Sequence, residues 1–169
     1  MATVWRTMAH WDKHEEALKW IRKEERVAIG HAYLGDLRQY ADPESISKAV
    51  GEALPSYANY GAMGRPLYDF CNTIRTGDLM IVSGVGYRAL VAEVTGEYEQ
   101  VDPSRSCVSG DDWINQRAIR ILPYSPDLVW KLAGARPAPG YNVRWNLIRC
   151  ALPVDIKHDL DRDLLSSNR

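Results

Sequence analysis

Cysteine is scarce in this chain of 169 residues, and its three copies form no recognisable pattern. Cys71, Cys107 and Cys150 are an odd number, widely spaced, with no Cys-x-x-Cys pair. This spacing speaks against a disulfide framework and against a zinc site. We expect three reduced thiols, with at least Cys71 in the core, and no metal centre.

Long hydrophobic runs are also missing. No apolar run approaches the roughly 18 residues that a membrane-spanning helix needs, and the N-terminus lacks the apolar stretch of a signal peptide. We therefore expect a soluble protein of the cytoplasm with no membrane partner. With 169 residues, of which 46% are hydrophobic, the chain suffices for a single domain over residues 1–169 with one substantial core.

Charge of either sign is not in excess, because 21 basic and 22 acidic side chains leave a net charge of −1. General attraction to nucleic acid or to an anionic membrane is therefore not expected. The distribution is uneven. Residues 51–103 hold three basic side chains against seven acidic, whereas residues 104–150 hold seven basic, six of them arginine, against three acidic. Arginine suits phosphate contacts, although local ion pairs on a mixed surface explain the same count equally well.

Apolar runs separated by turn residues predict a sheet. A Gly-Asp turn opens the run at 78–82, a loop with two glycines separates it from the run at 89–94, and a third run follows at 114–121. Their short connections predict three neighbouring strands. Further strands are expected at 2–6, 26–31 and 141–151.

Helices are expected between these strands. Asp12 begins the first helix, with Glu15 at the capping-box position, and this helix runs to about Arg22. Pro66 begins another, in which apolar side chains at i, i+3, i+4 and i+7 form a core-facing stripe. These are Leu67, Phe70, Cys71 and Ile74. Shorter helices are expected around 45–53 and after Pro126. The segment 134–140 has the composition of an internal linker, and 155–169 is a polar helix or tail.

The expected fold class is therefore α+β: a small curled β-barrel of five or six strands with inserted helices. The order of the pieces resembles the PUA-like superfamily. The matching pieces are Val-Trp-Arg at 4–6, Val-Ala-Ile-Gly-His at 27–31, the helix and Gly-Asp turn at 70–78, Val-Ala-Glu-Val-Thr-Gly-Glu-Tyr at 91–98, and the Trp and Arg-bearing strand at 113–121. The likeness is nearest to the EVE and YTH branch, and to the EVE-like N-terminal modules of Mrr-type, modification-dependent restriction enzymes. It covers residues 3–122.

This resemblance implies a cleft that takes one extruded base, often a modified one, into an aromatic pocket. Candidate pocket residues are then Trp5, His31, Tyr33, Ser83, Tyr98 and Trp113, and candidate phosphate contacts are Arg117, Arg120 and Arg144. His31 stands where the family usually has tryptophan, which makes that wall smaller and titratable.

Structural readings of the same residues stay open. Trp5 suits a core, Tyr98 a strand edge, His31 a capping or surface position and Ser83 an ordinary turn. Trp113 is the strongest pocket candidate, because it lies in a polar loop. The remaining tryptophans, Trp11, Trp20, Trp130 and Trp145, are assigned to packing, and Asp78 to capping its turn.

Patterns with catalytic potential are incomplete. Asp78 and Glu93 have the rough spacing of a metal-dependent nuclease, but Thr95 stands where such centres need lysine. The glycines at 84 and 86 lack the Gly-Lys-Ser/Thr of a P-loop. We expect a non-enzymatic reader of a modified base in DNA, without a cofactor, either standalone or as the specificity module of a nuclease. A reader of modified RNA bases, a small enzyme acting on a nucleotide or free base, and a protein-interaction domain with a vestigial pocket remain as alternatives.

Overall fold

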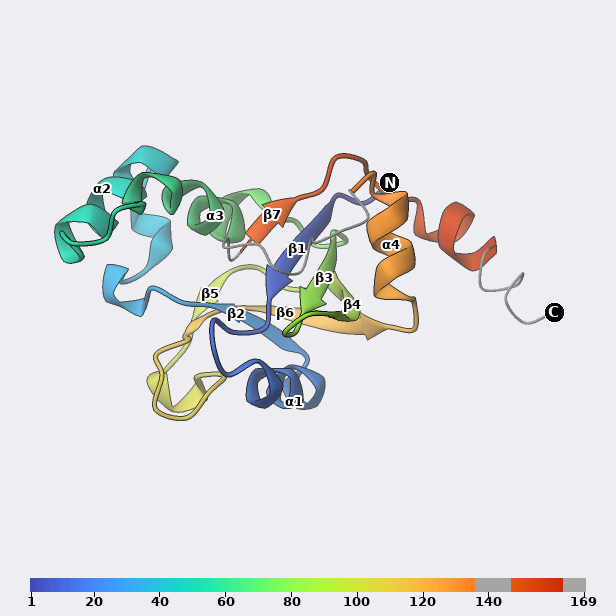
Figure 1. Cartoon of the computed structure of the whole chain (residues 1–169), viewed down its shortest axis with the longest axis horizontal. Coiled ribbons are helices and arrows are strands. Elements are labelled where there is room, and N and C mark those ends of the chain that lie inside the picture. The colour runs from blue at the N-terminus through green and yellow to red at the C-terminus, as the bar shows by residue number, and fades with distance from the viewer. Residues whose placement is uncertain (136–146, 163–169) are drawn as a thin grey trace.

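One strongly curled sheet forms the centre of the molecule (Figure 1). The computed structural model describes residues 1–135 and 147–162. Within them, hydrogen-bonded strands follow the order β2-β6-β4-β3-β1-β7, and the short β5 pairs with β6 beside this path. The strands are β1 (Val4–Met8), β2 (Arg26–Ile29), β3 (Leu79–Ser83), β4 (Arg88–Val94), β5 (Glu99–Gln100), β6 (Asn115–Leu122) and β7 (Leu147–Arg149). This confirms the α+β class with a small curled sheet and inserted helices.

The three strands predicted to be neighbours are neighbours. β4 pairs antiparallel with β3 on one side and with β6 on the other. β1 lies parallel to β3, with Val4 opposite Leu79 and Met8 opposite Ser83. The last residue of β1 therefore lies beside the last residue of β3, so the chain leaves both strands at the same end of the sheet.

Alternation along β3 divides the interior into two cores. Met80 and Val82 belong to the larger core, and Leu79 and Ile81 to a smaller one that α4 (Pro126–Leu132) covers. All of β3 is buried because successive side chains point to opposite faces and both faces are covered. A near-continuous apolar run is the sequence signature of such a strand.

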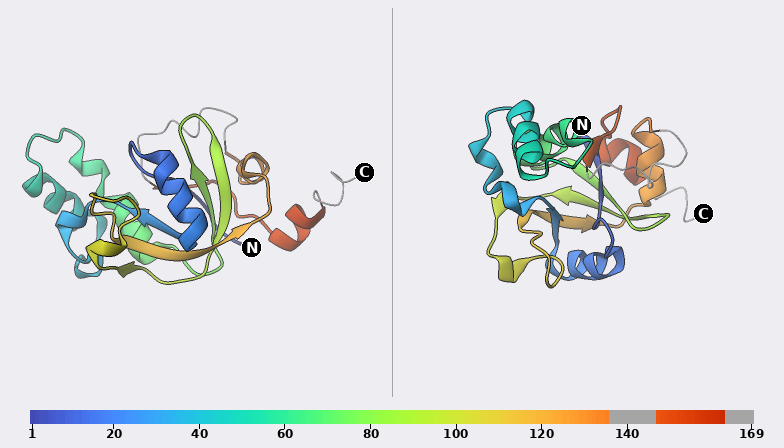
Figure 2. Two further views of the ribbon diagram at one scale, coloured as in Figure 1. Left: turned by 90° about the horizontal axis from the view of Figure 1, so that it is seen from below. Right: turned by 60° about the vertical axis from the view of Figure 1, so that its left-hand side comes forward.

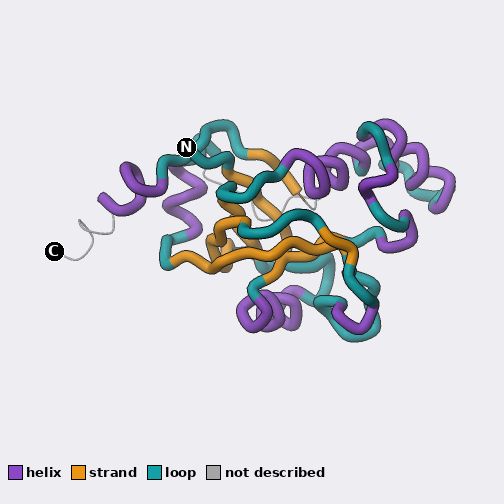
Figure 3. The backbone as a smooth tube through the Cα atoms, turned by 180° about the vertical axis from the view of Figure 1, so that it is seen from behind, coloured by secondary structure: helices purple, strands orange, loops and turns teal. Residues whose placement is uncertain are grey.

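The helices lie around the sheet. α1 (His14–Glu24) lies below it in Figure 1, while α2 (Pro43–Ala53) and α3 (Gly64–Tyr68) form an arm at the end opposite to α4, as Figures 2 and 3 also show. The short helical turns are η1 (Ala32–Leu34), η2 (Leu37–Gln39), η3 (Tyr60–Ala62), η4 (Asp69–Thr73), η5 (Pro103–Arg105) and η6 (Ile156–Leu160). α2 begins with a capping box between Asp42 and Ser45 and buries Ile46 and Val50.

The start of α1 differs from the prediction. Asp12 does not cap the helix. The residue directly before α1 is Lys13, whose side chain makes no capping hydrogen bond. Instead, the backbone N–H groups of Asp12 and Lys13 donate to Nδ1 of His10, at 3.2 and 3.0 Å. The imidazole thus fixes the two residues before the helix, whereas a capping side chain would accept from N–H groups of the first helical turn.

The helical segment before β3 has the predicted apolar stripe, and all four of its residues are buried. It begins at Gly64 rather than at Pro66, and α3 continues into η4, a turn of wider π-type helix. Asp78 stabilises the following turn, since its Oδ2 accepts from the backbone N–H of Arg75 at 3.0 Å.

Toward the C-terminus, β7 lies within the predicted last strand, whose first part, residues 141–146, is outside the described residues. The same holds for residues 136–140 of the predicted linker and 163–169 of the predicted tail. The described part of that tail includes the helical turn η6. Of the helices in residues 1–135 and 147–162, none is long and apolar enough to cross a membrane.

Candidate functional site

An aromatic cavity of about 400 Å³ lies where the sheet meets the arm of α2 and α3. Its lining comes from the end of β1, the loop before α1, the residues after β2, the segment between α2 and α3, and the residue two places before β6. The lining residues are Met8, Trp11, Gly30, His31, Tyr33, Leu54, Tyr57, Met63 and Trp113. Five of them carry aromatic rings, and none of the described lining residues carries a carboxylate, an ammonium or a guanidinium group. We call this the aromatic cavity; its size and character are those of a small-ligand site.

Trp113 lies against the backbone at the end of β2. The indole packs on Gly30, where a Cβ atom would lie 3.4 Å from Cε2 of Trp113, the distance of close van der Waals contact. Two hydrogen bonds hold the segment: the Trp113 N–H donates to Ser106 Oγ at 3.0 Å, and the Asn115 amide donates to the Gly30 carbonyl at 3.0 Å. Trp113 is only 6% exposed and belongs to the larger core as well as to the cavity. The polar sequence around it did not predict this burial.

His31 and Tyr33 form a hydrogen-bonded pair just after the end of β2. His31 Nδ1 lies 2.8 Å from the Tyr33 hydroxyl oxygen, and the His31 backbone is left-handed at φ 70°. Burial lowers the pKa of His31 and raises that of Tyr33, so both side chains are neutral at neutral pH. A neutral imidazole carries one donor and one acceptor, and the tautomer of His31 decides whether Nδ1 donates to the Tyr33 hydroxyl or accepts from it.

Trp11 and Tyr57 are cavity residues that the sequence reading missed. Trp11 was assigned to packing, but it is 64% exposed, because it lies in the loop between β1 and α1 rather than in either element. Its polar neighbours in the sequence, His10 and Asp12, are the signal that indicates exposure. Tyr57 lies in the loop after α2.

Three predicted pocket residues lie elsewhere. Trp5 is buried in the larger core, where its indole N–H donates to Asp78 Oδ2 at 3.0 Å. Tyr98 is buried too; its hydroxyl donates to Asn115 Oδ1 at 2.7 Å and accepts from the Leu37 N–H at 3.1 Å. Neither residue lines the aromatic cavity: alternation along β1 directs Trp5 into the core, and Tyr98 lies just before β5 with its ring buried. Ser83 is fully buried beside Met8 and does not line the cavity.

The predicted phosphate contacts need a larger correction. Arg117 is fully buried, and its guanidinium donates to three backbone carbonyls: Phe70 at 2.6 Å, Cys71 at 3.0 Å and Gly96 at 3.0 Å. Arginine content alone does not show exposure: this side chain turns inward and satisfies carbonyls of η4, so it is not available to a phosphate. Arg120 is on the surface and pairs with Glu93. Arg144 lies outside the described residues.

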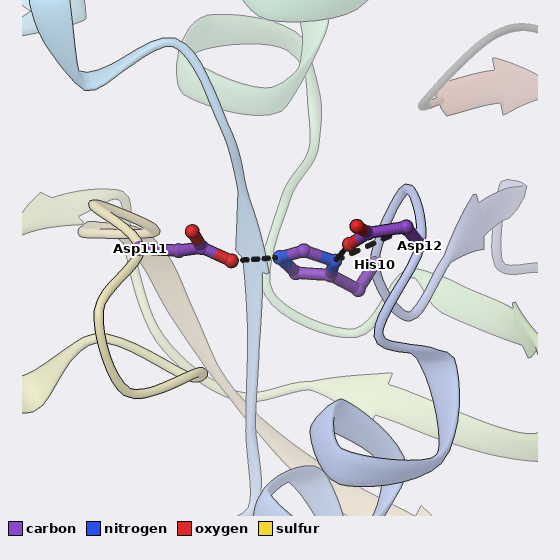
Figure 4. Close-up of side chains that lie close together, drawn as sticks. All are labelled: His10, Asp12 and Asp111. Atoms are coloured by element: carbon purple, nitrogen blue, oxygen red, sulfur yellow. Dashed lines mark hydrogen bonds and ion pairs between the residues drawn. The ribbon is translucent and has the colours of Figure 1, made fainter.

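One buried histidine, His10, lies between the carboxylates of Asp12 and Asp111 (Figure 4). His10 is fully buried, with Nδ1 3.0 Å from Asp12 Oδ1 and Nε2 3.2 Å from Asp111 Oδ2. The Lys13 ammonium lies 3.2 Å from the same Asp111 oxygen. The His10 ring packs against the Trp113 ring with centroids 4.2 Å apart.

This cluster does not form a convincing metal site. Ligand atoms of His10, Asp12 and Asp111 lie within 4.8 Å of one another, but the two carboxylates face opposite nitrogens of one imidazole (Figure 4). A single ion cannot contact both nitrogens, and Nδ1 already accepts two backbone N–H groups. The geometry fits a support for the cavity wall better than an ion site.

A second hollow, an open groove of about 810 Å³, runs along α2 and includes Lys48, Glu52, Tyr60 and Arg65. Among its described lining residues it has one aromatic side chain, Tyr60, and charges of both signs, of which Lys48 and Glu52 pair with each other, so it offers a flat base fewer stacking faces than the aromatic cavity does. The aromatic cavity is therefore the candidate functional site. No protein-family model matches the chain, and no curated protein matches it.

Proposed function

We propose that this protein binds a single base of nucleic acid, extruded from its strand, in the aromatic cavity, and that the ligand is a modified base in DNA. The observation that carries the proposal is the lining of that cavity, five aromatic rings without a formal charge among the described residues. Flat, uncharged walls favour a flat, uncharged ligand. A nucleic-acid partner also agrees with the cytoplasmic location expected from the sequence.

The energetics require several aromatic walls. Extruding a base from a duplex costs a few kcal/mol. Stacking on aromatic side chains returns about 1–3 kcal/mol per base. Trp11, Tyr33 and Tyr57, each at least 40% exposed, are available for stacking in the free protein. A modifying methyl or hydroxymethyl group adds apolar or polarisable surface, which strengthens this contact selectively.

Base edges require hydrogen bonds in addition. His31 Nδ1 and the Tyr33 hydroxyl bind each other at 2.8 Å, which leaves His31 Nε2 and the second hydrogen-bonding capacity of the hydroxyl for a base edge at the cavity wall. Their mutual hydrogen bond orients both side chains, which supports recognition of one edge. The tryptophan that the resemblance would place here has only a donor, so this wall reads an edge differently.

The lining also supports binding rather than catalysis. Apart from the imidazole of His31 and the tyrosine hydroxyls, the described lining residues offer no nucleophile, and they include no carboxylate that would orient a base. The curled sheet fits the fold implied by the PUA-like resemblance. We therefore favour an EVE-like reader, standalone or serving a nuclease, over a small nucleotide enzyme.

Binding to matched duplexes tests the proposal. Each duplex carries one central base, unmodified, N6-methyladenine, 5-methylcytosine or 5-hydroxymethylcytosine, and the RNA counterparts carry the same changes. At fixed salt we expect at least a tenfold preference for one modified DNA, equivalent to about 1.4 kcal/mol. Preference for the RNA series would identify an RNA reader instead, and turnover of a nucleotide panel would identify an enzyme.

Trp11→Ala is the variant of choice for the cavity, because its exposed side chain leaves no core hole. Trp113→Ala is unsuitable, because truncating a buried tryptophan costs about 3–5 kcal/mol of stability. The matched control is Tyr87→Ala, an exposed aromatic outside the cavity whose hydroxyl contacts Glu15. Loss of preference in the first variant alone supports the proposal; equal binding of all duplexes by wild type contradicts it.

A further inference from the structure

His10 is not part of the cavity lining, yet it contacts both tryptophans that are. Its ring centroid lies 4.2 Å from that of Trp113 and 6.0 Å from that of Trp11, to which it is nearly parallel at 27°. The side chain is fully buried. Burying a polar ring costs more free energy than burying an apolar one, so packing of the core alone does not account for a histidine between these two tryptophans.

The hydrogen bonds of His10 extend this connection to the backbone. Nδ1 accepts from the N–H groups of Asp12 and Lys13, which fixes the turn that carries Trp11. Because Nδ1 is an acceptor, the neutral ring carries its proton on Nε2. Nε2 faces Asp111 Oδ2 at 3.2 Å, an ion-pair separation without good hydrogen-bond alignment.

Asp111 connects His10 to the loop before β6. The Ser106 hydroxyl contacts the Asp111 carbonyl and accepts from the Trp113 N–H at 3.0 Å, so Asp111 and Trp113 belong to one tightly closed loop. One imidazole therefore joins two segments that are about a hundred residues apart in sequence and that each supply one indole. His10 thus contacts the segments of Trp11 and Trp113 in three ways: by ring packing, by the hydrogen bonds that Nδ1 accepts, and by the contact of Nε2 with Asp111.

We propose that His10 is the positioning residue of the aromatic cavity: in its neutral form it fixes the relative placement of Trp11 and Trp113, and its protonation weakens ligand binding. The proposal rests on the base-binding function for its ligand, but the positioning itself is a property of the free protein. His10 touches no ligand in this scheme and acts through the two indoles.

Protonation changes the connections in a defined way. A second proton on Nδ1 removes the acceptor for the Asp12 and Lys13 N–H groups and directs Nδ1–H to Asp12 Oδ1, 3.0 Å away. The turn that holds Trp11 then loses its anchor. The charged groups that face the ring are Asp12 and Lys13 from its own segment and Asp111 from the loop before β6. Burial lowers the pKa of His10 and outweighs the two carboxylates, so the ring is neutral at neutral pH.

The free protein provides the first test. Imidazole ¹⁵N shifts should show His10 with its proton on Nε2 near neutral pH. Protonated imidazole quenches a neighbouring indole, so the emission assigned to Trp113, as wild type minus Trp113→Phe, should fall as pH drops through the His10 titration. His31→Gln is the control, since His31 also titrates in acid but does not contact Trp113 by ring packing; its Trp113 emission should keep the pH dependence.

Binding to the preferred modified duplex provides the second test. His10→Gln lacks an acceptor at the Nδ1 position, and we expect about tenfold weaker binding at neutral pH, the loss expected when one stacking face is misplaced. His10→Asn places its amide oxygen where Nδ1 was and should recover part of this loss. Wild-type affinity should fall in acid, whereas the affinity of His10→Gln should vary less with pH.

The outcomes separate the two proposals. Trp113 emission indifferent to pH, together with wild-type binding by His10→Gln, overturns the positioning role and leaves the base-reading function standing. If no oligonucleotide binds, the base-reading function fails, while the ¹⁵N and emission measurements still decide the role of His10. If neither His10 variant folds, the wild-type pH titration of tautomer and emission decides it alone.

Discussion

At the scale of single residues, Arg117 shows how a charged side chain can serve the interior. Its three donated bonds tie the end of η4, through Phe70 and Cys71, to the turn at Gly96. Backbone carbonyls supply the compensation that a buried guanidinium needs, so the charge needs no buried carboxylate partner. The exposed Glu97 carboxylate lies 4.0 Å away and adds little.

The first prediction concerns this residue. Arg117→Met keeps the bulk but leaves three buried carbonyls without donors, and we expect the free energy of unfolding to fall by about 3 kcal/mol or more. Urea denaturation measures the change. Arg120→Ala, on the same strand but exposed, should change stability by less than about 0.5 kcal/mol. A stable Arg117→Met with weaker DNA binding would restore the phosphate-contact role that the burial argues against.

The buried thiols and Tyr98 lead to a second prediction. Burial raises the pKa of Cys107 to about 12, that of Cys71 to about 11 and that of Tyr98 to about 12. In each case the folded state keeps a proton that the unfolded chain gives up near pH 9 to 10. Their contribution to stability is therefore complete below about pH 8.5 and is lost as pH rises toward 12.

Denaturation midpoints measured from pH 8 to 11 should accordingly decrease. Cys107→Ala removes one such group, so the slope of stability against pH should become shallower by about one proton. Stability independent of pH in this window would show that the thiols and Tyr98 ionise without penalty in the folded protein. At neutral pH the same burial predicts slow reaction of Cys107 with thiol reagents.

At the scale of elements, the packing of α2 against α3 holds the arm that supplies Leu54, Tyr57 and Met63 to the cavity. Gly64 is the contact point: a Cβ atom there would lie 1.9 Å from the Pro43 carbonyl oxygen and 2.3 Å from Ser47 Oγ. The Ser47 hydroxyl meanwhile accepts from the Gly64 N–H at 3.0 Å. Close helix contact thus depends on the absence of a side chain.

The third prediction follows from that contact. Gly64→Ala should destabilise the protein by about 1–3 kcal/mol, because a methyl group forces backbone atoms of α2 and α3 apart. It should also weaken ligand binding, since the arm forms one side of the cavity. Gly61→Ala is the matched control three residues away, where nothing lies within 4 Å of the added Cβ. Equal stability of the two variants in thermal denaturation would contradict the packing argument.

Elements also show how far the sequence could be interpreted. The runs of β3, β4 and β6 and the stripe at Leu67, Phe70, Cys71 and Ile74 follow periods of 2 and 3.6, so local pattern was sufficient. Asp12 was wrongly predicted to cap α1, because the chain before this helix turns around the His10 ring, whose Nδ1 accepts from the N–H groups of Asp12 and Lys13. Trp11 and Arg117 were misplaced because exposure depends on how distant segments pack, which no local window contains.

At the scale of the whole molecule, charge limits how nucleic acid can bind. The net charge is −1, and of the seven basic residues in 104–150, Arg117 is buried and Arg120 pairs with Glu93. The excess of positive charge in that stretch is therefore only partly available at the surface. Stacking in an uncharged cavity does not depend on ionic strength, whereas phosphate contacts do.

The last prediction joins these two facts. Each neutralised phosphate contributes about −0.9 to the slope of log K against log salt, so one or two contacts give a slope of about −1 to −2. Between 50 and 200 mM salt, affinity for both modified and unmodified duplex should then fall about four- to sixteen-fold. Their ratio should stay constant, because the modification is recognised inside the cavity. Fluorescence anisotropy at several salt concentrations measures both quantities. A slope steeper than about −4 would require an extended phosphate-binding surface. A preference that disappears as salt rises would show that the modification is recognised at the charged surface and not in the aromatic cavity.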